Sequence, residues 1–222
     1  MLLAILLLPN VAASADAAKK AYEKGKACLE KKDFDAAIVA FTVAIRLDPK
    51  HAEAYSDRGF AYAAKGEYDK AIADCTEAIR LDPKCAKAYL NLGYAYRTKG
   101  EPDKAVADYT EAIRLDEKWA DAYFARGMTY GDSGDYDTAI ADFSKAIQLD
   151  PKDPKAYGNR GVVYEKRRAY NKAIADYTAV IRLMPLNAIA YFHRGTCYQE
   201  NGDTAKAEED FAQAKKLGYK TE

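Results

Sequence analysis

Residues 54–83 read AYSDRGFAYAAKGEYDKAIADCTEAIRLDP, and this stretch decides the fold because close copies of it recur along the chain. Its central glycine, Gly59, belongs to a series spaced by 34 residues. A fixed period of this length is typical of stacked supersecondary units, none of which can bury its own apolar face alone. The sequence therefore predicts an array that offers an extended surface to partners. The series of glycines is Gly25, Gly59, Gly93, Gly127, Gly161 and Gly195.

Each copy predicts a pair of helices. Tyr55, Gly59 and Tyr62 are spaced as i, i+4 and i+7, which places them on one face of a helix. Ala71 and Ala78 have the same i and i+7 spacing in the second half of the copy. A glycine inside a helix costs roughly 0.5–1 kcal/mol relative to alanine. We therefore expect the paired helix to approach each of these glycines closely, with a small alanine facing it.

Turn residues predict where the helices end. Glycines at one register after the first helix are expected to act as C-caps. Arg168 takes this register in the fifth copy, so we expect that turn to differ. Asp-Pro pairs are expected to end the second helices, because a residue before proline resists the helical conformation. The capping glycines are Gly66, Gly100, Gly134 and Gly202.

The period and its tyrosine, glycine, alanine and proline positions resemble the tetratricopeptide repeat family. The resemblance implies an all-α, right-handed α-solenoid of six 34-residue helix-turn-helix repeats. In the second helix of the last repeat, Glu208 and Lys215 stand where the other repeats carry Ile or Val, so this helix is expected to be a polar cap. The expected repeats are residues 18–51 (repeat 1), 52–85 (repeat 2), 86–119 (repeat 3), 120–153 (repeat 4), 154–187 (repeat 5) and 188–221 (repeat 6).

Residues 1–15 differ from the repeats and look like a signal peptide. Met1 to Leu8 are wholly apolar, and Ala13-Ser14-Ala15 is a small-x-small cleavage motif. The apolar run is too short to span a bilayer, which needs roughly 20 residues. Export to the periplasm or the exterior, after cleavage near Ala15, is therefore expected. The alternative is a mis-assigned start or a disordered tail on a cytoplasmic protein, since no Lys or Arg precedes the apolar run.

Composition argues against several functions. The 34 basic and 34 acidic residues cancel, whereas nucleic-acid binders usually carry an excess of Lys and Arg. The only histidines, His51 and His193, lie in different repeats, and there is no phosphate-binding glycine loop, nucleophile triad or CxxC pair. We therefore expect a non-catalytic protein without a cofactor or metal, and we interpret its four cysteines as unpaired packing residues.

Arginines recur just before the repeat glycine, and an aspartate follows each of them by 16 residues. Because every such arginine has an aspartate within its own repeat, we expect ion pairs inside each repeat. An arginine ladder for an acidic ligand is the alternative. The expected pairs are Arg58 with Asp74, Arg126 with Asp142, Arg160 with Asp176 and Arg194 with Asp210.

The resemblance implies that a ligand lies along the concave side, which first helices line in this family. Large apolar residues mixed with polar ones on those helices suit a peptide or helix laid in a groove. The alternative is that they only complete packing between first helices. A clamp for a carboxylate is disfavoured, because Asp57 would repel it. The expected groove residues are Phe60, Leu90, Asn91, Tyr94, Arg97, Phe124, Met128, Asn159, Val162, Phe192 and His193.

The sequence thus predicts a non-catalytic scaffold for protein–protein interaction, whose partner it does not name. The competing interpretation is a structural module that self-assembles into a homo-oligomer through its ends or its concave face. Neither interpretation includes nucleic-acid binding or a membrane span in the mature chain.

Overall fold

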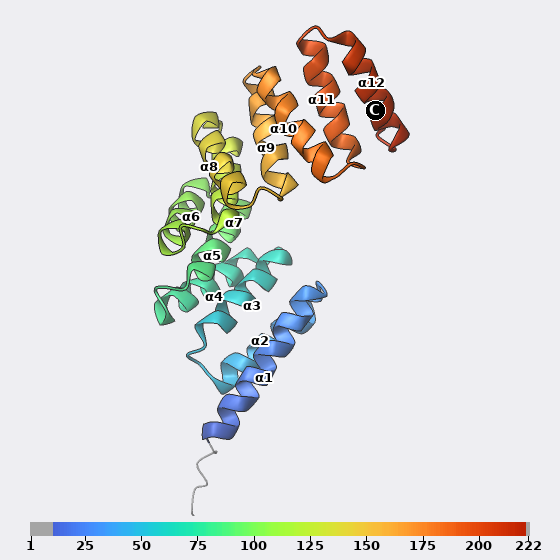
Figure 1. The fold of residues 1–222 in the computed structure, drawn as a ribbon. Helices are drawn as coiled ribbons and strands as arrows, with labels where there is room; N and C mark the ends of the chain where they lie inside the picture. Colours follow the sequence, from blue (N-terminus) through green and yellow to red (C-terminus); the bar gives the residue numbers. More distant parts are fainter. Residues whose placement is uncertain (1–10, 221–222) are drawn as a thin grey trace, which may run out of the picture. The chain divides into compact units, whose positions relative to one another are not determined.

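The structure is a computed structural model, and it describes residues 11–220. Within this range the regular structure is entirely helical, as expected for an all-α repeat protein (Figure 1). The twelve helices are α1 (Val11–Glu30), α2 (Phe34–Leu47), α3 (Ala52–Ala64), α4 (Tyr68–Leu81), α5 (Ala86–Lys99), α6 (Pro102–Leu115), α7 (Ala120–Asp132), α8 (Tyr136–Leu149), α9 (Pro154–Lys166), α10 (Tyr170–Leu183), α11 (Ala188–Glu200) and α12 (Thr204–Lys216). Each repeat contributes one pair.

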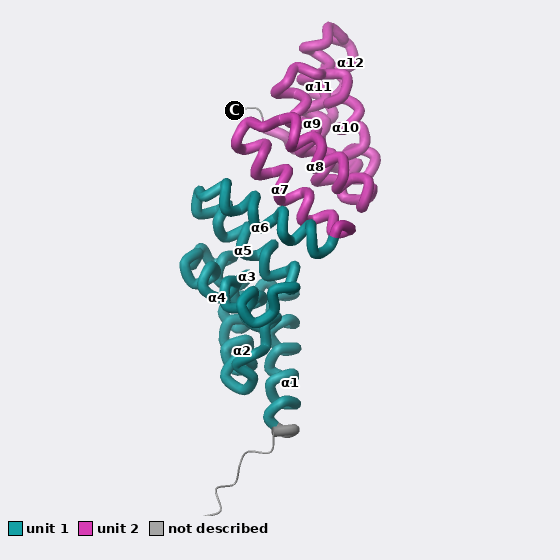
Figure 2. The backbone as a smooth tube through the Cα atoms, turned by 90° about the vertical axis from the view of Figure 1, so that its left-hand side faces the viewer, with its two compact units in different colours: residues 1–116 teal, residues 117–222 magenta. Residues whose placement is uncertain are grey.

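The chain divides into two compact units, which are coloured separately in Figure 2. Unit 1 ends at Asp116 and contains α1 to α6, whereas unit 2 begins at Glu117 and contains α7 to α12. Within each unit the two helices of a repeat pack most extensively on each other, and each second helix packs next on the first helix of the repeat that follows it. This nearest-neighbour packing is what a solenoid requires.

A fully buried alanine marks the centre of every helix pair. It lies 12 residues after the repeat glycine, on the second helix, and is at most 1% exposed in all six repeats. Its small side chain allows the two helices to lie close together, which explains why the alanine register is kept. The alanines are Ala37, Ala71, Ala105, Ala139, Ala173 and Ala207.

The helix C-caps are confirmed at the glycines that the sequence singled out. Gly66, Gly100, Gly134 and Gly202 all have positive φ, between 80° and 86°. In the first of these turns, the amide of Gly66 donates to the carbonyl of Ala63 at 3.0 Å. Glycine suits this left-handed position because it has no Cβ.

The expectation that the turn at Arg168 would differ is wrong. Arg168 adopts φ 57°, in the same left-handed region as the glycines, and so does Lys32 in the first repeat with φ 58°. The amide of Arg168 donates to Glu165 at 2.8 Å and that of Ala169 to Tyr164 at 2.8 Å, so the capping bonds are those of the other turns. These bonds hold the residue in a conformation that costs roughly 1–2 kcal/mol for a residue with a Cβ.

The mid-helix glycines do lie against the paired helix, but the facing residue differs from the expected alanine. A Cβ on Gly127 would meet Asp142 Cβ and the ring of Phe143, each at 3.1 Å. Ala139 instead lies near Gly131, one turn further along α7, at 3.8 Å from its Cβ position. The side chain 16 positions after the glycine, an aromatic ring in five repeats and the Cys75 thiol in repeat 2, therefore occupies the space that a Cβ would need.

Candidate functional site

The first helices of unit 1 expose two aromatic side chains at the same register. Phe60 on α3 is 38% exposed and Tyr94 on α5 is 39% exposed, and the two helices lie side by side. Leu90, one turn before Tyr94, is half-buried, and Arg97 is half-buried at the end of the same helix. Four of the expected groove residues of unit 1 therefore lie on the surface of its first helices.

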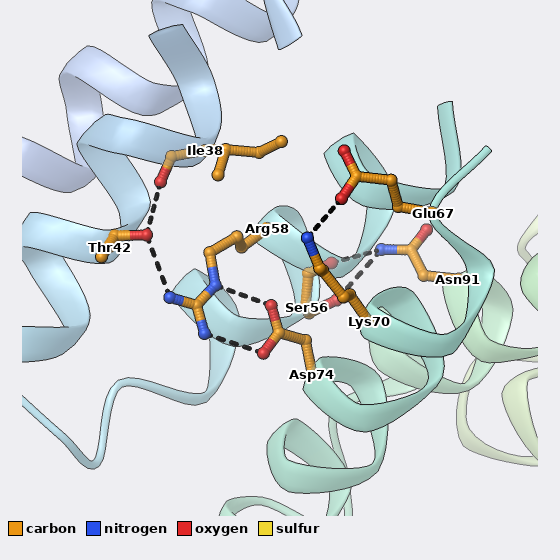
Figure 3. A network of polar contacts seen from close by, with 8 residues as sticks. All are labelled: Ile38, Thr42, Ser56, Arg58, Glu67, Lys70, Asp74 and Asn91. Atoms are coloured by element: carbon orange, nitrogen blue, oxygen red, sulfur yellow. Dashed lines mark hydrogen bonds and ion pairs between the residues drawn. The ribbon is translucent and has the colours of Figure 1, made fainter. Parts of the chain in front are cut away.

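Asn91 is not available to a ligand, which corrects its place among the groove residues. It is 6% exposed, and its amide nitrogen donates to the backbone oxygen and to Oγ of Ser56, each at 3.1 Å. Figure 3 shows these two bonds linking α5 to α3. Asn91 thus fixes neighbouring first helices to each other.

A buried carboxylate lies beside this contact. Asp57 on α3 is 0% exposed and accepts a hydrogen bond from the Tyr22 hydroxyl at 3.0 Å. Lys87 Nζ forms an ion pair with the other carboxylate oxygen at 2.5 Å. Burial, and then the Asp57 charge, raise the pKa of Tyr22. The cluster joins α1, α3 and α5.

In unit 2 the expected groove residues are half-buried. Phe124 and Met128 on α7 pack against the core formed by Ala139, Phe143 and Val163. The rings of Phe124 and Phe143 lie 5.8 Å apart. These two residues therefore contribute to packing as well as to the surface, which is the alternative that the sequence left open.

Val162, Asn159, Phe192 and His193 are also half-buried in unit 2, on α9 and α11. Asn159 donates from its side chain to the Lys155 carbonyl at 2.9 Å, one turn back along α9. Val162 packs against the core around Tyr177. All six expected groove residues of unit 2 therefore lie on first helices, with part of each side chain at the surface.

A polar cluster on α9, α10 and α11 lines a hollow of about 510 Å³. Glu165 accepts a hydrogen bond from the Tyr177 hydroxyl at 2.8 Å, and His193 Nδ1 lies 3.1 Å from the same oxygen. Burial alone would raise the pKa of Glu165, but the contacts with His193 and Tyr177 outweigh it and lower the pKa. The sequence did not single out Glu165, because no other repeat has an acid at this register.

The ion pairs inside the repeats are confirmed. Arg58 donates to both oxygens of Asp74, at 2.7 and 2.8 Å, and from its remaining nitrogen to Thr42 Oγ1 at 3.0 Å (Figure 3). The pairs formed by Arg126, Arg160 and Arg194 have the same two-point geometry. These guanidinium groups tie helices together, so an arginine ladder for an acidic ligand is not supported.

Repeat 3 breaks this pattern, because Leu92 stands at the arginine position opposite Asp108. Burial raises the pKa of Asp108 from its usual 3.8 to about 7. The arginine of the other repeats would offset this burial, and Leu92 has no charge with which to do so.

Glu208 and Lys215 on α12 are exposed, so the last helix of repeat 6 presents polar side chains where the other second helices carry Ile or Val. Beside Lys215, the rings of Phe192 and Tyr219 stack at 4.3 Å between centroids and line a hollow of about 780 Å³ with Phe211. The capping helix therefore leaves an apolar surface uncovered at this end of unit 2.

An apolar cluster that was not among the expected site residues lies in the turn between α10 and α11. Met184, Leu186 and Ile189 are 47%, 80% and 59% exposed. The signal was present, because the corresponding turns of the four preceding repeats carry Asp, Lys and a charged residue at these three positions. Within residues 11–220 no helix is long and apolar enough to cross a membrane, and no group of His, Cys, Asp and Glu is arranged to hold a metal ion.

Comparison with solved structures finds the same architecture in other proteins. The MamA protein is 28% identical with a TM-score of 0.69, over 75% of this chain and 91% of that one. YrrB, described as a TPR protein with an unusual peptide-binding site, is 23% identical with a TM-score of 0.68, over 81% of this chain and 92% of that one. Pseudomonas aeruginosa pilF is 19% identical with a TM-score of 0.81, over 93% of this chain and 94% of that one.

Family comparisons locate the repeats independently. A profile described as TPR repeat matches residues 25–66 and 127–167. Profiles described as tetratricopeptide repeat match residues 52–85 and 86–118, and residues 166–218. A search of curated proteins gave no significant match. Because the matched segments cover most of both units and coincide with the helix pairs, the chain belongs to the tetratricopeptide repeat family.

Proposed function

We propose that the protein is a non-catalytic scaffold that binds a peptide or a helical segment of a partner protein along its first helices. The observation that carries the proposal is the exposure of Phe60 and Tyr94 at one register of adjacent first helices. Large aromatic side chains exposed in series are unusual on a solvated helix face, and they are the type of residue that anchors protein interfaces.

The pairing of charged groups inside the protein favours a ligand that is held by apolar side chains. Asp57 and the repeat arginines are occupied by partners inside the protein, so they are not free to grip a charged ligand. A peptide-binding site is described for YrrB, which shares the fold. We therefore assign binding to the apolar positions of the first helices, with nearby polar groups setting the orientation of the ligand.

The test is affinity capture with the double variant Phe60→Gln/Tyr94→Gln. Loss of captured proteins, with an unchanged unfolding midpoint, is the expected result, because both side chains are about two-fifths exposed and exposed substitutions usually change stability by within about 0.5 kcal/mol. Val39→Gln is the matched control, since Val39 is 65% exposed on α2, a second helix. Capture that is equally strong with the double variant would refute the proposed groove in unit 1.

A self-assembling structural module is the second candidate, and the uncovered hollow beside Phe192 and Phe211 favours it. A second copy packing on this end would bury the two rings. Light scattering over a range of protein concentrations tests this function. A mass that stays monomeric at high concentration would exclude it, whereas a dimer that Phe211→Gln abolishes would support it.

We also propose that the protein is exported after cleavage near Ala15. Residues 1–10, which carry the apolar run, lie outside the described residues, and α1 begins at Val11, so the cleavage point falls within this helix. The N-terminal sequence of the protein recovered from its host tests the proposal. A mature chain that begins at Asp16 is expected, and an intact Met1 would contradict it.

A further inference from the structure

We propose that the α10–α11 turn, together with the end of α12, is a site that binds the surface of an anionic lipid membrane. The turn exposes Met184, Leu186 and Ile189 at 47%, 80% and 59%. These are three of the six large apolar residues that are exposed within the described part of the chain, and they fall within six consecutive residues.

The fold does not require apolar residues in this turn. In the sister turns at Asp48, Asp82 and Asp150, the aspartate side chain accepts a bond from the amide two residues later, at 3.0–3.1 Å. Met184 cannot accept this bond, and yet its amide donates to Val180 as the aspartates donate to their own helices. Compared with the sister turns, the α10–α11 turn therefore lacks one hydrogen bond but keeps the same backbone bond. It exposes Met184, Leu186 and Ile189 to solvent, and we call these three side chains the apolar tip.

The surroundings of the tip are basic. Figure 1 places the turn and the C-terminal end of α12 at the same end of unit 2. The stack of Tyr219 on Phe192, at 4.3 Å, ties this end of α12 to α11 one turn after Ile189. Residues 182–190 and 211–220 contain four basic residues and no acid, and Glu222 lies outside the described residues. The four are Arg182, Lys215, Lys216 and Lys220.

The acid that most closely precedes these lysines on α12 is already paired. Asp210, the last acid on α12 before them, is bonded to Arg194 through both of its oxygens. The C-terminal turn of a helix also carries the negative end of the helix dipole, which favours lysines there in the folded protein. Their ammonium groups are exposed on Lys215, Lys216 and Lys220. The result is an apolar tip flanked by cations.

A lipid surface fits this arrangement better than a protein partner does. A stable protein interface takes about 800 Å² and 20–30 residues from each partner, far more than three side chains on a turn supply. A bilayer needs only that a few apolar side chains enter the headgroup region by about 5–10 Å while basic residues meet the anionic headgroups. Tyr219, with an apolar ring and a polar hydroxyl, suits the same boundary.

The experiment is co-sedimentation of the full chain with vesicles of equal parts phosphatidylserine and phosphatidylcholine, and with vesicles of phosphatidylcholine alone. We expect sedimentation with the anionic vesicles that weakens as salt is added, because salt screens the lysines. The variant Met184→Asp/Leu186→Lys/Ile189→Gln restores two sister-turn residue types and keeps the net charge at zero. Each methylene group that no longer enters the bilayer lowers the affinity roughly fourfold. The affinity of this variant for the anionic vesicles should therefore fall by more than about tenfold.

The lysines are tested separately. Lys215→Gln/Lys216→Gln/Lys220→Gln should weaken binding by about a hundredfold, since each lysine near an anionic surface contributes about fivefold. A matched control removes the same charge from the exposed lysines of α1, which are Lys19, Lys20 and Lys24. Val39→Gln is the control for an exposed apolar residue elsewhere.

Both controls should bind as the wild type does. Absence of wild-type sedimentation with the anionic vesicles would overturn the proposal, and so would undiminished binding by either turn or lysine variant. Concentration-dependent dimerisation that the turn variant abolishes, without any vesicle binding, would show that the patch is a protein interface instead. Circular dichroism melting of each variant shows whether it is folded, and the restored aspartate makes a loss of folding unexpected in the turn variant.

Discussion

Replacement of Gly59 by alanine is expected to destabilise unit 1, although alanine is the better helix former. A Cβ at this position would lie 2.6 Å from Cys75 Sγ and 3.1 Å from the backbone oxygen of Ala71. Ordinary contact begins at 3.4 Å, so the Cys75 sulfur would have to move by about 0.8 Å, and the Ala71 carbonyl is closer than an ordinary contact as well. Overpacking costs about 1–3 kcal/mol and the gain in helix propensity is at most about 1 kcal/mol, which leaves a net loss of up to about 2 kcal/mol when the full gain is counted.

Denaturation by urea, followed by far-ultraviolet circular dichroism, measures this loss, and hydrogen exchange locates it in α3 and α4. The matched control is Gly131→Ala on α7, where the nearest atoms to a new Cβ lie at 3.7 and 3.8 Å. With room for the methyl group, this variant should gain up to about 1 kcal/mol from helix propensity. The same substitution should therefore have opposite signs at the two positions.

A double variant separates the contact from other effects. Removing the sulfur in Gly59→Ala/Cys75→Ala takes away the atom at 2.6 Å, so part of the loss should be recovered relative to the sum of the single variants. The reasoning is refuted if Gly59→Ala is as stable as the wild type. It is also refuted if the two substitutions are additive, because the sulfur would then not be the obstacle.

Four further variants probe other features of the repeats. Arg168→Gly should stabilise unit 2 by up to about 1 kcal/mol, since it relieves a left-handed cost of roughly 1–2 kcal/mol against a glycine entropy cost of roughly 0.5–1 kcal/mol; a lower denaturation midpoint would contradict this. Burial raises the pKa of Asp108 to about 7, so the folded state binds the proton of this carboxyl group more tightly than the unfolded state does. The stability of the protein should therefore fall as the pH rises from about 4 to about 7. Asp108→Asn should remove that part of the pH dependence, and Leu92→Arg should reduce it by supplying the arginine of the sister repeats; denaturation at a series of pH values would show either result or its absence. Gly127→Leu should cost about 1–3 kcal/mol or more, because Asp142 and Phe143 already lie 3.1 Å from the Cβ position, and a uniformly protected variant in hydrogen exchange would contradict the packing argument.

The 34-residue period was sufficient to determine the helix pairs, their capping glycines, the ion pairs inside repeats and the polar last helix. Each of these depends on spacing along one helix or on a comparison between equivalent positions, and both can be read directly from a sequence. The partners of Arg58 and Arg194 were predictable for this reason. Their aspartates lie at a constant separation, whereas repeat 1 carries Lys24 and Ala40, and repeat 3 carries Leu92, at the corresponding positions.

Only the tertiary structure decided which side chains contact each other between helices. The period places Ala139 and Phe143 on the same face of one helix, and only the packing of α7 against α8 sets Phe143 against Gly127 and Ala139 near Gly131. Asn91 has the register of a surface residue, but the close approach of α3 and α5 buries it against Ser56. Arg168 keeps the turn of a glycine because the capping bonds to the last turn of α9 outweigh its local preference. For the glycine contacts and for Asn91, a contact between helices, whose geometry no single periodicity contains, prevailed over the expectation from one residue's register.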